Sequence, residues 1–135
     1  MEPSLESLVD ALEGFVRAPV TIFGFGNRLW RDDGAGSVIA DRLSSCPGVK
    51  AVDGGFTPEN HLEEVARTGP GTVLLIDTAD FGGLPGDARL MKPSELAGGG
   101  VSTHAGSPRM LARYLEARTG ARVAVLAIQP GDVAA

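Results

Sequence analysis

Thr72-Val-Leu-Leu-Ile-Asp-Thr78 is apolar at four consecutive positions and then ends on a carboxylate and a hydroxyl. A strand that is buried on both faces has this pattern, which is typical of a parallel sheet between two layers of helices. Val20–Gly24 and Arg122–Ile128 have the composition of buried strands of the same sheet, and Val49–Asp53 alternates as a strand does. Together these four segments predict an α/β fold built around a mostly parallel sheet.

Apolar residues at helical spacing occupy the segments between these strands. They predict a helix from about residue 4 to 17, a second from Ala35 to Leu43, a third opened by Pro58, and a fourth that begins at Ser107-Pro108. The fourth helix is expected to bury an apolar stripe made of Met110, Leu111, Tyr114 and Leu115. Ala88–Met91 is a candidate short strand in a region rich in Gly and Pro. This alternation predicts a three-layer α/β/α sandwich.

The composition limits the class of protein. A chain of 135 residues forms one domain, and its longest apolar run, Val123–Ile128, is far too short to span a membrane. The amino terminus lacks the basic start of a signal peptide, so we expect a soluble, cytoplasmic protein. Its single cysteine, Cys46, excludes an intramolecular disulfide and is expected in a loop. A net charge of −5 with scattered basic residues argues against nucleic acid or membrane partners.

Carboxylates follow each of the first three predicted strands. If strand 20–24 lies between the other two, Asp32-Asp33, Asp53 and Asp77 meet at one edge of the sheet, where ligands of open α/β sheets bind. A single aspartate of this kind usually caps a helix or a turn. Three carboxylates crowded together can coexist only if one of them is protonated or if they share a cation. The residues alone do not choose between Asp32 and Asp33.

A histidine could complete such a metal site, and the chain has two. His61 lies on a predicted helix, where a solvated surface position is the better interpretation. His104 lies in a loop just before the fourth helix, and its sequence position fits a capping residue and a ligand equally well.

A nucleotide-binding module is a rival interpretation. Gly24 and Gly26 match the first two glycines of a dinucleotide fingerprint and Asp53 stands where a ribose-binding acid would, but Leu29 replaces the third glycine. The P-loop, zincin and nucleophile-elbow motifs are absent from the sequence.

Five segments together resemble one known family, the hydrogenase maturation endopeptidases, and the form Asp53-Gly-Gly-Phe-Thr-Pro-Glu-Asn60 is most similar to the branch that processes hydrogenase 3-type large subunits. They follow the family's order along the chain. The segments are Gly24–Gly36, Val52–Asn60, Leu74–Asp80 with Pro85-Gly86, His104, and Ile128-Gln-Pro130.

The resemblance implies a fold, an activity and a site. The fold is a mixed five-stranded sheet of Rossmann-like, phosphorylase/hydrolase-like type. The activity is an aspartate-dependent endopeptidase that removes a C-terminal peptide from the nickel-loaded precursor of a hydrogenase large subunit. The nickel comes with that precursor, other divalent metals are expected to fit the same site, and the protease is expected to be a monomer, with a dimer as the alternative. Position by position, the metal site is Asp33, Asp77 and His104, the catalytic acids are Asp33 and Asp77, and the lining residues are Asn27 and Asp53.

The ends of the chain depart from the family pattern. Family members begin near the first strand and continue past the Gln-Pro segment into a C-terminal helix, whereas this sequence has an additional helix within residues 1–18 and stops at Ala135. We expect the N-terminal helix to cover the sheet surface that the C-terminal helix covers in relatives, because an exposed apolar sheet face is unstable in a monomer.

Overall fold

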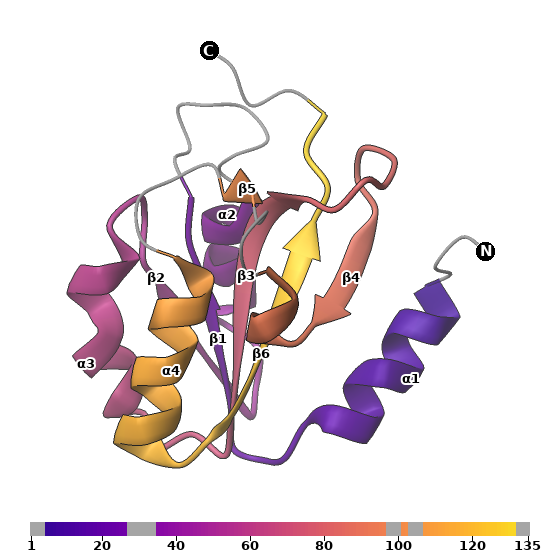
Figure 1. The fold of residues 1–135 in the computed structure, drawn as a ribbon. Helices are drawn as coiled ribbons and strands as arrows, with labels where there is room; N and C mark the ends of the chain where they lie inside the picture. Colours follow the sequence, from indigo (N-terminus) through magenta and orange to yellow (C-terminus); the bar gives the residue numbers. More distant parts are fainter. Residues whose placement is uncertain (1–4, 27–34, 97–100, 103–106, 132–135) are drawn as a thin grey trace.

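A computed structural model describes residues 5–26, 35–96, 101–102 and 107–131 of the chain, and its helices pack on a central sheet (Figure 1). The elements in chain order are α1 (Leu5–Phe15), β1 (Val20–Gly24), α2 (Ala35–Leu43), β2 (Val49–Asp53), the 3-10 turn η2 (Pro58–His61), α3 (Leu62–Ala66), β3 (Thr72–Asp80), β4 (Ala88–Met91), the 3-10 turn η3 (Pro93–Leu96), β5 (Val101–Ser102), α4 (Pro108–Thr119) and β6 (Arg122–Ile128).

The sheet confirms the predicted mixed, mostly parallel architecture. Its main path has the order β2-β1-β3-β6-β4, in which the first four strands run parallel and β4 runs antiparallel to β6. The two-residue strand β5, which the sequence did not predict, pairs antiparallel with the end of β3. Strand β1 lies between β2 and β3, so the carboxyl ends of all three strands meet at one edge. This is the arrangement on which the prediction of an acidic site depended.

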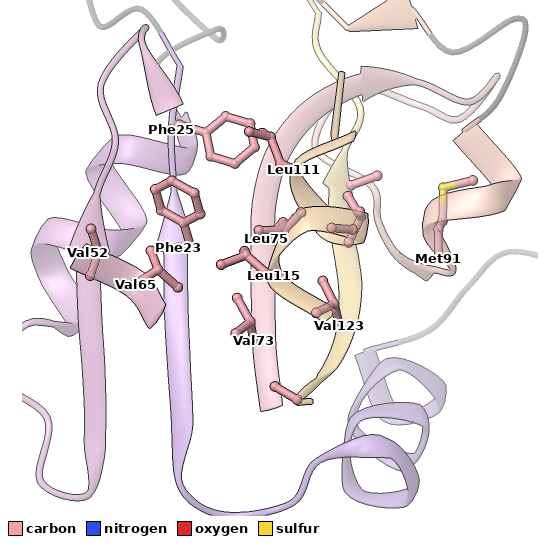
Figure 2. Packing of buried hydrophobic residues seen from close by; sticks show 14 of the residues in the cluster. Phe23, Phe25, Val52, Val65, Val73, Leu75, Met91, Leu111, Leu115 and Val123 are labelled. Atoms are coloured by element: carbon pink, nitrogen blue, oxygen red, sulfur yellow. The ribbon is translucent and has the colours of Figure 1, made fainter. Parts of the chain in front are cut away.

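Apolar side chains on the two faces of the sheet form two clusters. On one face, Phe23, Leu75 and Val123 pack with Val65 of α3 and Leu115 of α4 (Figure 2). On the other face, Ile22, Leu74, Ile76 and Ala124 pack against partly buried residues of α1 and α2, among them Phe15 and Ile39. The continuous apolar run of β3 therefore has a helical layer on each side, as its composition predicts.

Helix α4 shows how the sequence sets both ends of a helix. The Ser107 hydroxyl accepts a hydrogen bond from the Arg109 N–H at 3.2 Å, and Pro108 occupies the first turn. At the other end Gly120 takes a left-handed conformation with φ of 73°, which closes the helix.

The predicted apolar stripe of α4 was partly wrong. Leu111 and Leu115 are buried as expected, together with Ala112, but Met110 is 71% exposed and Tyr114 is 41% exposed. Tyr114 instead turns toward α3, where its hydroxyl donates a hydrogen bond to Glu63. The face of α4 that meets the sheet therefore consists of Leu111, Ala112 and Leu115.

Helix α1 packs only along one side. Leu12, Phe15 and Val16 are partly buried against the sheet face that α2 also covers, while Val9 is 41% exposed. The helix ends at Phe15, two residues before the predicted end. That α1 takes the place of a C-terminal helix stays a prediction. In the part of the chain that the structure describes, no helix has the length and apolarity to cross a membrane.

Candidate functional site

The carboxyl ends of β1 and β2 are joined by their glycine loops. The Gly54 N–H donates to the Gly24 carbonyl at 2.8 Å, and the Gly26 N–H donates to the Gly55 carbonyl at 2.6 Å. A Cβ atom on Gly54 would lie 2.7 Å from the Phe23 ring, so a side chain at this position would displace a core residue. The two loops therefore continue the parallel pairing past the strand ends and form one side of the site edge.

Helix α2 approaches the same edge through a contact between glycines. A Cβ atom on Gly24 would lie 2.0 Å from the Gly36 carbonyl oxygen, and one on Gly36 would lie 2.3 Å from the Ile76 carbonyl oxygen. The Ser37 hydroxyl adds a buried hydrogen bond to the Gly26 carbonyl at 3.2 Å. The first turn of α2 is thereby held directly against the peptide that joins Ile76 to Asp77.

Asp77 is the buried acid of this edge. Its side chain is 0% exposed, and its residue pairs in register with Ala127 of β6. Because side chains alternate along a strand, Asp77 shares the face of Leu75 and Ala79, which packs toward α3 and α4. A carboxylate in such apolar surroundings is costly unless polar groups or a cation compensate it. Asp77 is buried behind an apolar run as predicted, but the predicted strand end at Thr78 was wrong, because β3 continues to Asp80. Asp77 therefore lies inside β3, just past the end of β1, where Gly24 pairs with Ile76.

Four of the predicted site residues, Asn27, Asp32, Asp33 and His104, lie outside the described residues. Among the residues that the structure does describe, no three His, Cys, Asp or Glu side chains are gathered so that they could hold a metal ion.

Described residues close in sequence to Asp33 and to His104 nevertheless lie near Asp77. Asp33 comes three residues before Gly36, which contacts the Ile76 carbonyl. His104 comes two residues after Ser102, and Ser102 pairs with Ala79. Gly36 and Ser102 thus each lie beside a residue of β3 that is one or two positions from Asp77.

The remaining candidates have ordinary structural contacts. Asp53 is exposed at the carboxyl end of β2, and its Oδ1 accepts the Gly55 N–H at 2.9 Å. This turn contact is what a capping aspartate makes, and it gives no support to a ribose-binding role. His61 lies 3.1 Å from Glu64 at the surface, and Cys46 is exposed in a loop, both as predicted.

Gln129 organises the loop that follows β3, and the sequence did not single out this role. Its Oε1 accepts hydrogen bonds from the backbone N–H groups of Phe81 and Gly83, at 2.9 and 3.0 Å. Its Nε2 donates to Oδ1 of Asp80 at 3.1 Å. The side chain is only 8% exposed, so this amide uses both its ends inside the protein. The sequence feature that could have indicated this role is a polar residue directly after a buried strand.

The backbone of Gln129 closes the same loop from the other side. Its N–H donates to the Asp87 carbonyl at 2.8 Å, and its carbonyl accepts from the Gly86 N–H at 2.9 Å. The Gly82 N–H and the Gln129 amide both donate to Asp80, and these hydrogen bonds hold the pKa of the Asp80 carboxyl below its usual value. The loop that follows β3 is therefore anchored to the residue that follows β6.

Comparison with known proteins gives a consistent result. No protein-family model matches the chain. The hydrogenase 3 maturation protease of Escherichia coli is 34% identical over 74 residues, which are 53% of this chain and 47% of that relative, so the match spans about half the relative's length.

Solved structures match over more of the chain. The crystal structure of the NiFe hydrogenase maturation protease HycI from Thermococcus kodakarensis superposes with a TM-score of 0.78 at 31% identity, covering 93% of this chain and 81% of that one. The solution structure of the endopeptidase HycI from Escherichia coli superposes with a TM-score of 0.71 at 30% identity, covering 85% of this chain and 75% of that one. On these matches in sequence and fold, the chain belongs to the hydrogenase maturation protease family.

Proposed function

We propose that this chain is an endopeptidase that removes a C-terminal peptide from the nickel-loaded precursor of a nickel-iron hydrogenase large subunit. Family membership supports the peptidase activity, because the relatives that cover most of the chain carry the names maturation protease and endopeptidase. The single observation that carries the proposal within this chain is Asp77, a fully buried carboxylate at the edge of the sheet where α/β proteins bind ligands. The reaction would take place in the cytoplasm, with the precursor as partner.

Recognition of the substrate's nickel would fall to Asp33, Asp77 and His104. Two carboxylates and one imidazole suit a borderline divalent ion, and the negative charge of the two acids would offset the charge of the ion. The contacts of Gly36 with Ile76 and of Ser102 with Ala79 support this set, because they bring the chain next to Asp33 and His104 toward Asp77.

The acids would also carry the proton transfer. In hydrolysis of a peptide bond, a water oxygen bonds to the carbonyl carbon, the C–N bond breaks, and a proton passes from the water to the departing amine. Asp33 or Asp77 would accept that proton as general base and return it as acid. Asn27 and Asp53 would line the site beside them.

Cleavage of the precursor tests the proposal. We expect the wild-type chain, mixed with a nickel-loaded large-subunit precursor, to release a short C-terminal peptide that mass spectrometry detects. Asp77→Asn should slow the release by about 100-fold or more, the loss typical of a missing acid or base. Asp41→Asn, which changes an exposed carboxylate on α2, is the matched control and should cleave as the wild type does.

Two results would contradict the proposal. Undiminished cleavage by Asp77→Asn would remove the acid from the mechanism. No cleavage by the wild type, together with Asp77-dependent binding of nickel, would identify a binding module without peptidase activity.

A further inference from the structure

A basic groove lies beside α4. It is a hollow of about 580 Å³ whose charged lining consists of Lys92, Arg109, Arg113, Arg122 and Glu116. Four cations thus face one carboxylate in a protein whose net charge is −5. The volume falls within the range of about 300–1,000 Å³ that ligand sites occupy.

The two flanks of α4 differ in whether their arginines are paired with carboxylates. On the flank that faces α3, the Arg118 guanidinium is neutralised by Glu63 at 3.2 Å, and Tyr114 donates to the same carboxylate. On the flank that faces the groove, Arg109 and Arg113 follow each other by one helical turn. Within the described ranges, neither of them forms an ion pair with a carboxylate. Cations gathered around one hollow repel one another, so an anion in the groove would relieve that repulsion.

The floor of the groove is apolar and its rim is partly fixed. Val123 is buried beneath it, and Phe15 and Pro93 add partly exposed apolar surface. The Arg122 guanidinium donates to the Phe15 carbonyl at 3.2 Å, which holds one of the four cations in place. A ligand that matches this lining carries several negative charges around an apolar group.

The groove is also distinct from the Asp77 edge. Val123 stands four residues before Ala127, the partner of Asp77 in the sheet, which corresponds to about 13 Å along β6. The floor of the groove therefore lies toward the amino end of the strand, away from Asp77.

We propose that the basic groove binds an acidic stretch of the polypeptide substrate, in which two or three carboxylates flank an apolar side chain. The inference rests on the proposed function, since it assigns the occupant to the precursor. Guanidinium groups bind carboxylates through paired hydrogen bonds, and the spacing of Arg109 and Arg113 presents two of them side by side. Specific protein complexes bury about 1,200–2,000 Å², so a protease for a folded partner needs contacts beyond the cleavage site.

Charge reversal of the groove separates binding from chemistry. We expect Arg109→Glu combined with Arg113→Glu to raise KM for precursor cleavage by about tenfold or more and to leave kcat within about twofold of the wild type. The matched control, Arg42→Glu combined with Lys50→Glu, makes the same change in net charge at exposed positions on α2 and β2 and should leave KM unchanged. Equal KM values for the two double variants would overturn the inference.

A direct binding measurement tests whether the groove binds an acidic peptide, even if the wild type cleaves nothing. In a ¹H–¹⁵N titration of the full chain, a synthetic peptide of alternating glutamate and leucine residues should shift the backbone signals of Lys92, Arg109 and Arg113. The same peptide with lysine in place of glutamate should not. Absence of these shifts with the glutamate peptide would overturn the inference. In a parallel titration with tripolyphosphate, shifts that appear with this anion but not with the peptide would overturn it as well. Failure of the proposed function would appear separately, as absence of peptide release by the wild type.

Discussion

Replacement of Gln129 by leucine tests whether this residue, directly after β6, holds the loop that follows β3. The variant keeps a side chain of similar size but removes the acceptor of the Phe81 and Gly83 N–H groups. Each such bond contributes about 1 kcal/mol, so the two together should lower the free energy of unfolding by about 2 kcal/mol. Loss of the donor to Asp80 acts in the same direction.

Urea unfolding and hydrogen exchange measure the effect of Gln129→Leu. With a slope of about 2 kcal/mol per molar urea, the unfolding midpoint should fall by about 1 M. The amides of Phe81 and Gly83 should exchange faster than in the wild type, while those of the β3 interior stay protected. An unchanged midpoint together with unchanged exchange at these two amides would refute the role assigned to Gln129.

Gln129→Glu adds a pH dependence with a definite sign. The new carboxylate keeps the acceptor of the Phe81 and Gly83 N–H groups, which favours its charged form, but it is buried and faces Asp80 in place of a donor. We expect burial and repulsion to dominate and to raise the pKa of Glu at this position in the folded protein. A raised pKa means that the folded state takes up protons that the unfolded state does not, so the variant gains stability as the pH falls. Its urea midpoint should approach that of the wild type between about pH 7 and pH 4, whereas Gln129→Leu should keep its deficit.

Two further predictions concern packing. Gly36→Ala should lower the free energy of unfolding in urea by about 3 kcal/mol or more, because its Cβ atom would lie 2.3 Å from the carbonyl oxygens of Ile76 and Phe25. Gly14→Ala has open space around the new methyl group and should stabilise α1 by about 0.5–1 kcal/mol. Equal effects of the two substitutions would contradict the close contact of α2. Deletion of residues 1–18 should expose the apolar face under α1 and yield an aggregated or unfolded chain in size-exclusion chromatography; a soluble, folded product would show that α1 is dispensable.

The fold was predictable where apolar blocks are bounded by turn residues. The limits of β1, α2 and β2 agree with the sequence, because Gly24, Gly34 and Gly54 interrupt the apolar pattern at their ends. Two residues are too few to show a strand pattern, so β5 could not be predicted. The stripe of α4 was misjudged because Ala112, a small residue, meets the sheet, while the larger Met110 remains exposed.

The site was predictable only where strand order alone places a residue. Asp77 ends an apolar run, so its position at the sheet edge followed from the sequence. The contacts of Gln129 depend on a loop that folds back from β3. The local signal, a polar residue directly after a buried strand, does not identify these partners. The basic groove could not be predicted for a similar reason, because Lys92, Arg113 and Arg122 come from three different segments that meet only when α4 packs beside β6.

The two outer strands of the sheet have a consequence for the behaviour of the protein at high concentration. Strand β2 has five residues and carries the exposed charges of Lys50 and Asp53, and β4 has four residues and carries the exposed Arg89. Short, charged outer strands are poor templates for the addition of a strand from another molecule, because each addition would bury a charge for few hydrogen bonds. The sheet should therefore not extend into fibrils through its edges, and the native chain should remain dispersed when it is concentrated.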